Sequence, residues 1–358
     1  MPDRNIVQKI GDAYYFQILK AYNNNYESVG AIGDIATALK EVFRYFEPAF
    51  FEGRFFMCKH FGDEFIFNKA NGQLLYDKNI LINRTSGEII IQTFANGDFY
   101  IWDGEHVTDL YANSEILLYR FENHKDVFVA HGTEVDITVN PKGSRFAPQY
   151  FDLIKALTAY SIERVYNSSC PIFSNSWYDS NRIFFKSEGS GNNAPEKYMQ
   201  QSLYEFLRTQ ESLRGIGFEC VREFNVKPQQ PKPVDIRMQW KEANRVALIE
   251  MKWIGSATST KTDKTRTINP SEINAGYDQL KGYFDEAERD MPSTIVKAHM
   301  VVIDGRRNNI KKGAITVSYQ DGMYYKDEEI ELEHQKKYYL TNPRFEKPVR
   351  MFSSPITV

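Results

Sequence analysis

The sequence predicts two domains: an α+β N-terminal domain, in which helices precede a β-rich meander, and an α/β domain with a central mixed sheet flanked by helices. Apolar residues recur at helical spacing over residues 5–48, and short strands rich in Phe, Ile, Tyr and Val fill residues 54–140. Beyond residue 190, helical patterns alternate with apolar strands. The chain has 358 residues, enough for two domains of ordinary size. We place the domains at 1-170 and 171-358.

The composition favours a globular protein that works away from membranes. Hydrophobic residues make up 42% of the chain and charged residues 25%, and no apolar run reaches the roughly eighteen residues of a membrane span. The first residues lack the apolar stretch of a signal peptide. Three isolated cysteines, Cys58, Cys170 and Cys220, predict neither a disulfide framework nor a structural zinc site. We therefore expect no membrane association and a cytoplasmic location.

The N-terminal domain carries no predicted catalytic site. Residues 5–48 favour two helices separated by the turn signal Asn23–Asn25, and the strands that follow are separated by Asn-Gly and Asp-Gly turns. Its histidines are scattered, without the spacing of metal ligands. Its aromatic residues alternate with polar ones, which indicates sheet core rather than a surface that stacks on bases. We expect this domain to recognise DNA, a ligand or a partner protein, or to regulate the second domain.

The second half begins with a helical pattern that places an acid at its start. A helix over 148–166 connects the halves, and residues 187–193 favour a loop. Pro195 suits the first turn of the next helix. Glu196 precedes the apolar residues Met199 and Leu203 by three and seven positions, so it faces inward. The helix dipole alone would favour an acid there, which is the alternative explanation.

Three strands are predicted next, over 218–226, 234–240 and 245–251. The last contains a fully apolar run, which is typical of a central buried strand, and it ends in Glu250-Met251-Lys252. Glu250 and Lys252 are two positions apart and leave the strand on one face. An acid and a lysine there are costly unless they are paired or bound to a metal.

A basic segment and a second helix complete the pattern. Residues 255–271 read as a long polar loop, whose Lys261, Lys264 and Arg266 suit a phosphate backbone, although a plain solvated loop is an equal alternative. A helix over 272–288 then places Gln279 and Tyr283 on one face. A fourth core strand is predicted over 296–303.

Residues 193–304 resemble the core of the PD-(D/E)xK nuclease superfamily, which has the restriction-endonuclease-like fold. The resemblance lies in Pro233-Val234-Asp235, in Glu250-Met251-Lys252, and in their place on predicted strands. Gln279-Leu280-Lys281-Gly282-Tyr283 resembles the QxxxY motif of the RecB-like branch. Two departures are plain: Val234 interrupts the Pro-Asp pair, and Glu196 stands where the RecB-like branch often carries a helix histidine.

The resemblance implies a role for each motif residue. Mg²⁺, for which Mn²⁺ can substitute, would be held by carboxylates and a main-chain carbonyl, and a lysine would orient water or stabilise the transition state. A helix acid would serve a second metal or its water shell. The residues concerned are Asp235, Glu250 and the Met251 carbonyl for the metal, Glu196 for the second metal, Lys252 for the transition state, Gln279 and Tyr283 for hydrogen bonds to the site or substrate, and Lys261, Lys264 and Arg266 for DNA.

The function implied is a Mg²⁺-dependent nuclease acting on DNA rather than RNA, an endonuclease in restriction or antiphage defence. A homodimer is expected, since cutting both strands takes two sites. Net charge is -3, so nucleic acid must bind local basic patches. The alternatives are a non-catalytic nucleic-acid-binding or assembly protein that retains the fold, and a RecB-like exonuclease in DNA repair.

Overall fold

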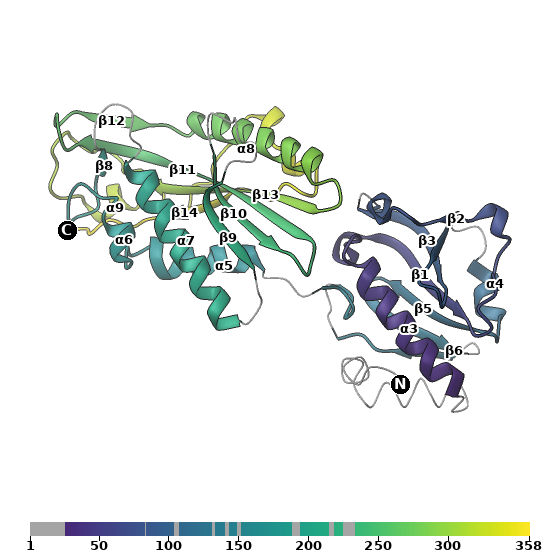
Figure 1. The fold of residues 1–358 in the computed structure, drawn as a ribbon. Helices are drawn as coiled ribbons and strands as arrows, with labels where there is room; N and C mark the ends of the chain where they lie inside the picture. The colour runs from purple at the N-terminus through teal and green to yellow at the C-terminus, as the bar shows by residue number, and fades with distance from the viewer. Residues whose placement is uncertain are drawn as a thin grey trace. The chain divides into compact units, whose positions relative to one another are not determined.

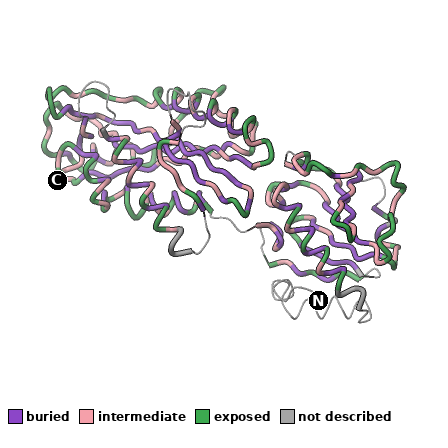
Figure 2. Tube along the Cα trace, viewed as in Figure 1, coloured by how far each residue is buried: buried purple, intermediate pink, exposed green. Residues whose placement is uncertain are grey.

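The fold is mixed α/β, with two mixed sheets flanked by helices (Figure 1). The strands of both sheets are largely buried (Figure 2). The first predicted helix and the turn at Asn23–Asn25 lie outside the residues described. The computed structural model describes residues 26–82, 84–103, 107–130, 133–139, 143–148, 152–187, 194–214, 218–224 and 233–358.

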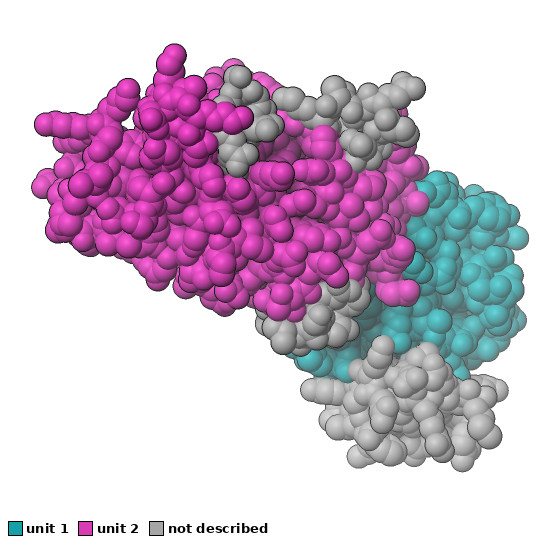
Figure 3. Space-filling model, turned by 60° about the vertical axis from the view of Figure 1, so that its left-hand side comes forward, with its two compact units in different colours: residues 1–149 teal, residues 150–358 magenta. Residues whose placement is uncertain are grey.

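The chain divides into two compact units, 1–149 and 150–358 (Figure 3). This division falls before the predicted connecting helix, whereas the sequence placed the boundary after residue 170. That helix is α5, Leu153–Tyr160, continued by one π-helical turn over Ser161–Val165. It contacts α7 of the second unit, which explains where the division falls.

Unit 1 is a seven-stranded sheet in the order β2-β4-β3-β1-β5-β6-β7, and α3 (Tyr26–Val42) packs against its central strands. The predicted succession of helix and β-rich segment is present. The sheet is not a pure meander, because β1 (Glu52–His60) pairs parallel with β3 (Ser86–Thr93). The other elements are η1 (Pro48–Phe50), η2 (Lys69–Asn71), β2 (Gln73–Leu74), η3 (Lys78–Leu81), β4 (Phe99–Asp103), α4 (Val107–Ala112), β5 (Ile116–Glu122), β6 (Lys125–Ala130) and β7 (Thr133–Asp136).

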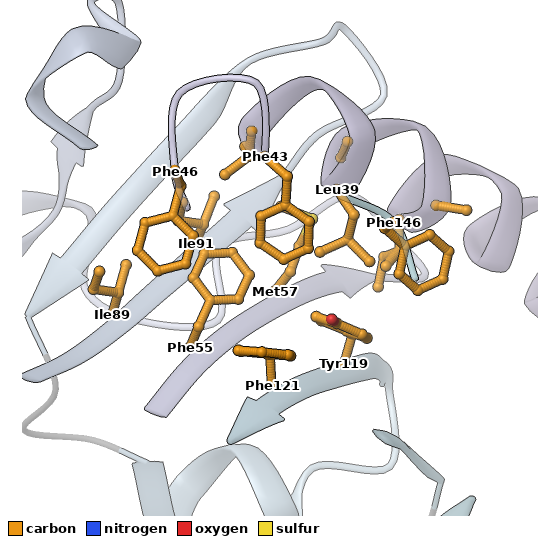
Figure 4. Close-up of a cluster of buried hydrophobic side chains, with 14 of the residues drawn as sticks. Leu39, Phe43, Phe46, Phe55, Met57, Ile89, Ile91, Tyr119, Phe121 and Phe146 are labelled. Carbon is orange, nitrogen blue, oxygen red and sulfur yellow. The ribbon is translucent and has the colours of Figure 1, made fainter. Parts of the chain in front are cut away.

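Aromatic rings fill the space between α3 and the sheet of unit 1 (Figure 4). Phe43 and Phe46 follow α3, and both lie within 5.3 Å, centroid to centroid, of Phe55 on β1. Tyr119 and Phe121 of β5 meet the same cluster from the neighbouring strand. These five side chains are fully buried or nearly so. For Phe55, Tyr119 and Phe121, which lie on strands, this confirms the interpretation as sheet core.

Unit 2 is built on the sheet β14-β13-β11-β10-β9. Strand β10 (Val234–Trp240) pairs antiparallel with β11 (Arg245–Ser259), which pairs parallel with β13 (Ile295–Gly305). Helix α7 (Ala194–Arg214) packs against alternate residues of β11, and α8 (Ser271–Asp290) packs against the intervening ones, so the helices cover opposite faces. The remaining elements are α6 (Pro171–Ser174), β8 (Phe185–Ser187), β9 (Glu219–Phe224), β12 (Thr265–Ile268), α9 (Tyr319–Gly322), η5 (His334–Lys336), η6 (Tyr338–Leu340) and β14 (Val349–Phe352).

The predicted polar loop over 255–271 is wrong for most of its length. Strand β11 continues through Ser259 and reaches 15 residues. Strand β12 returns antiparallel along this extension, and β8 pairs parallel with it, so its polar residues lie in a three-stranded region. Gly255 is the residue where β11 changes partner, because its pairing with β13 ends at Ile254 and its pairing with β12 begins at Gly255. The φ of Gly255 is +135°, and a Cβ there would lie 2.9 Å from the Gly305 backbone.

None of the described helices is both long and apolar enough to cross a membrane.

Candidate active site

The register of β10 and β11 brings the two predicted metal ligands together. Ile236 pairs with Ile249, so the next position along each strand sets Asp235 beside Glu250. The burial of the flanking residues explains this register, because Ile236 and Ile249 both belong to the core that α7 covers. Both carboxylates are buried, and Glu250 has no exposed surface.

Lys252 bridges the acid of the strand and the acid of the helix. Its ammonium donates hydrogen bonds to Glu250 Oε1 at 2.5 Å and to Glu196 Oε1 at 3.3 Å. It also donates to the Met251 carbonyl at 3.1 Å. Glu196 reaches this place from the first turn of α7, as its inward position in the sequence predicted. The structure thus joins Glu196, Glu250 and Lys252 in one cluster.

Asp235 is held from two sides. Its Oδ2 accepts the backbone N–H of Met251 at 2.6 Å, and its Oδ1 accepts the side-chain amide of Gln200 at 2.5 Å. Sequence analysis missed Gln200. The signal was present, since Gln200 follows Glu196 by four positions and so shares its face of α7.

The electrostatics of the cluster follow from burying several acids beside one lysine. Burial, and then the charges of Glu250 and Glu196, raise the pKa of Asp235 well above its usual value, against the opposing effect of Lys252. For Lys252 burial disfavours the ammonium, but the charges of Glu250, Glu196 and Asp235 outweigh it and raise the pKa. Lys252 is therefore a cation at neutral pH, whereas Asp235 lies in an excess of negative charge.

The QxxxY residues lie next to the cluster and form hydrogen bonds with each other and with the backbone that leads into β10. The Gln279 amide donates to the Tyr283 hydroxyl at 2.5 Å, and that hydroxyl donates to the Pro233 carbonyl at 3.2 Å. Burial, with the charges of Glu250 and Asp235, raises the pKa of Tyr283 to about 12, although its bond with Gln279 acts in the opposite direction. Tyr283 is thus a neutral hydrogen-bonding group.

The side chains of Glu196, Asp235, Glu250 and Lys252 line one cleft of about 560 Å³. Of the predicted catalytic residues all but Tyr283 line it, together with Gln200 and Arg266. The Arg266 guanidinium lies 6.0 Å from the ring centroid of Trp253, on the wall formed by β11 and β12. Of the three predicted DNA contacts only Arg266 lines the cleft, while Lys261 and Lys264 are exposed on the hairpin. A second hollow, of about 350 Å³ between α7 and β9, contains none of the predicted site residues.

The donor set of the cleft suits a divalent cation by its chemistry. Within the described segments, no three His, Cys, Asp or Glu side chains converge closely enough to form a metal cage by themselves. The available donors are nevertheless all oxygens, which Mg²⁺ and Mn²⁺ prefer: the carboxylates of Glu196, Asp235 and Glu250 and the Met251 carbonyl. With every group ionised, these three carboxylates and the Lys252 ammonium carry a charge of −2, since −3 + 1 = −2. Glu223, Glu272 and Arg266 line the same cleft and bring the charge of the whole lining to −3, since −5 + 2 = −3. A divalent cation would balance the charge of the four-residue cluster.

No family model, no curated protein and no solved structure matches this chain.

Proposed function

We propose that this protein is a Mg²⁺-dependent nuclease that hydrolyses DNA phosphodiester bonds, acting as an endonuclease in restriction or antiphage defence. The observation that carries the proposal is the position of the Lys252 ammonium, 2.5 Å from Glu250 Oε1 and 3.3 Å from Glu196 Oε1, with Asp235 beside Glu250. A half-buried lysine among three acids is costly for a structural role, whereas phosphodiester hydrolysis needs both an oxygen-rich cation site and an adjacent positive group.

The topology of unit 2 supports membership in the PD-(D/E)xK superfamily. A helix carrying an acid precedes strands β9, β10 and β11, and helix α8 then leads to the parallel strand β13. Asp235 lies on β10 and the Glu250-Met251-Lys252 motif on β11, in the order that the superfamily pattern requires. The motif residues therefore share one site, as the proposal needs.

Each side chain has a separate task in the proposed reaction. A divalent ion held by Asp235, Glu250 and the Met251 carbonyl, with Glu196 for a second ion or its waters, would lower the pKa of a bound water and neutralise charge on the phosphate. Lys252 would donate hydrogen bonds to the oxygen on which negative charge grows. Arg266, on the wall of the same cleft, would bind a neighbouring phosphate of the strand.

The decisive experiment is a cleavage assay on supercoiled plasmid with and without Mg²⁺. We expect the wild-type protein to nick or linearise the plasmid only with the ion. Asp235→Asn, Glu250→Gln and Lys252→Met should each lower the rate at least about 100-fold while the protein stays folded. Asp290→Asn, which changes an acid at the far end of α8, is the matched control and should cleave normally.

The outcomes separate the proposal from its alternatives. DNA binding without cleavage by the wild-type protein would identify a nucleic-acid-binding or assembly protein. Degradation of linear DNA alone, with release of mononucleotides, would identify an exonuclease. Faster cleavage of an RNA of the same sequence would reverse the preference for DNA.

A further inference from the structure

We propose that Gln200 is a positioning residue of the cleft, whose amide fixes the orientation of the Asp235 carboxylate toward a divalent cation. The inference rests on the proposed function and adds to it a residue that no sequence motif indicated. It is carried by a hydrogen bond of 2.5 Å from Gln200 Nε2 to Asp235 Oδ1, in a part of the cleft where Gln200 is only 7% exposed.

The contact restrains Asp235 because it gives the second carboxylate oxygen a hydrogen-bond donor. The Met251 backbone N–H already holds Oδ2 at 2.6 Å, and Gln200 holds Oδ1. A carboxylate with a donor on each oxygen cannot rotate about its Cβ–Cγ bond without breaking one of the two bonds. Because one donor comes from β11 and the other from α7, the orientation of Asp235 depends on both elements.

An amide suits this task better than a charged group would. Gln200 donates a hydrogen bond without adding a positive charge that would compete with a bound cation. Its nitrogen faces Asp235 because only that end of the amide can donate to a carboxylate. Hydrogen bonds to metal-binding carboxylates are a recurrent way to fix their direction.

The placement on α7 links Gln200 to Glu196. The two residues are one helical turn apart and line the same cleft. Helix α7 therefore contributes one acid to the cluster and one amide that acts through Asp235. Gln201, the next residue, lines the separate hollow between α7 and β9 and provides a matched control of the same chemistry.

The test compares Gln200→Met with Gln201→Met in the full-length protein. Mg²⁺ binding is measured by calorimetry without DNA, and cleavage is measured as a function of Mg²⁺ and of DNA concentration. We expect Gln200→Met to weaken Mg²⁺ binding about 10- to 100-fold and to raise the Mg²⁺ concentration for half-maximal cleavage by the same factor. The KM for DNA at saturating Mg²⁺ should not change, and Gln201→Met should match the wild type.

Gln200→Asn covers the case in which the Met variant does not fold. It keeps the amide but shortens the side chain by one methylene, so we expect the same loss of Mg²⁺ affinity. If Gln200→Met and Gln200→Asn bind Mg²⁺ like the wild type, or lose only kcat, the inference is overturned while the proposed function stands. If the wild-type protein neither binds Mg²⁺ nor cleaves DNA, the proposed function fails, and the inference fails with it.

Discussion

The Tyr283 hydroxyl of α8 donates a hydrogen bond to the carbonyl oxygen of Pro233, two positions before Asp235. Gln279 donates in turn to that hydroxyl at 2.5 Å. The pair therefore ties α8 to the residue that leads into β10, and it reaches Asp235 through the backbone. This contact gives the Gln-x-x-x-Tyr spacing a physical purpose in this chain, because both side chains must come from one face of the helix.

Removing that hydroxyl should loosen the start of β10. Tyr283→Phe loses the bonds to Pro233 and Gln279, so we expect the free energy of unfolding to fall by about 0.5–1.5 kcal/mol and Mg²⁺-dependent cleavage to slow severalfold. Denaturant titration and the plasmid assay measure the two effects. Tyr338→Phe is the control, since its hydroxyl binds Asp278 outside the cleft and its loss should leave cleavage unchanged. Equal cleavage by both variants would contradict this role of Tyr283.

Gly276 of α8 makes room for the side chain of Lys252. A Cβ at this position would lie 2.8 Å from Lys252 Cγ and Cε, closer than carbon atoms pack. Gly276→Ala should therefore displace the ammonium and lower kcat at least about tenfold, with little change in DNA affinity. Gly282→Ala on the same helix meets nothing within 4 Å, so it should stabilise the protein by up to about 1 kcal/mol and leave kcat unchanged. An unchanged kcat in Gly276→Ala would show that the position of Lys252 is not critical.

The β11–β12 hairpin should bind the DNA backbone. Arg266 lies on β12, and Lys264 immediately precedes that strand. Each phosphate contact that is lost should reduce the magnitude of the slope of log K against log salt concentration by about 0.9. Lys264→Ala and Arg266→Ala are measured by fluorescence anisotropy at several salt concentrations. Lys312→Ala, an exposed lysine elsewhere in unit 2, should keep the wild-type slope. Three identical slopes would exclude the hairpin from the DNA-binding surface.

A buried histidine should make the protein sensitive to acid. Burial, and then Lys297, lower the pKa of His299 to about 3. In the unfolded chain His299 binds a proton below about pH 6.5, whereas in the folded chain it stays neutral down to about pH 3. The free energy of unfolding therefore falls by about 1.4 kcal/mol for each pH unit between these two values. His299→Phe should lose that slope in denaturant titrations, whereas His334→Gln, at an exposed site, should retain it. The same slope in His299→Phe and the wild type would refute the assignment.

Sequence patterns predicted the elements whose signal is local. The strand over 234–240 has the predicted bounds because Val234, Ile236 and Met238 alternate with polar residues, and the helix predicted over 272–288 is observed as Ser271–Asp290. The continuation of β11 could not be predicted in this way. Its polar residues are stabilised in a strand by pairing with β12 and β8, and such partners are set by tertiary structure.

The same distinction applies to the candidate site. Glu250 and Lys252 were found because an acid and a lysine at the end of an apolar strand are costly unless they are paired, and Glu196 because it faces inward from the start of its helix. The structure places them together with Asp235. Gln200 was missed because an amide on a helix is common and carries no titratable group. The contact of Gln200 with Asp235 joins residues 35 positions apart, so it becomes visible only in the folded structure.

The boundary between the units leads to the last prediction. The hydroxyl of Tyr160 in α5 donates to Ser202 of α7 at 2.9 Å, and its ring lies 5.3 Å from that of Phe206. Tyr160 has no exposed surface, so α5 belongs to the core of unit 2. A fragment of residues 150–358 should therefore unfold cooperatively and retain Mg²⁺ binding. A fragment of residues 171–358 lacks α5, so the face of α7 that carries Ser202 and Phe206 loses its cover. Since removing large buried side chains destabilises a core, this fragment should lose at least about 3 kcal/mol of stability. Calorimetric melting of both fragments decides the matter: equal stability would mean that α5 is dispensable and that the boundary after residue 170 is the functional one.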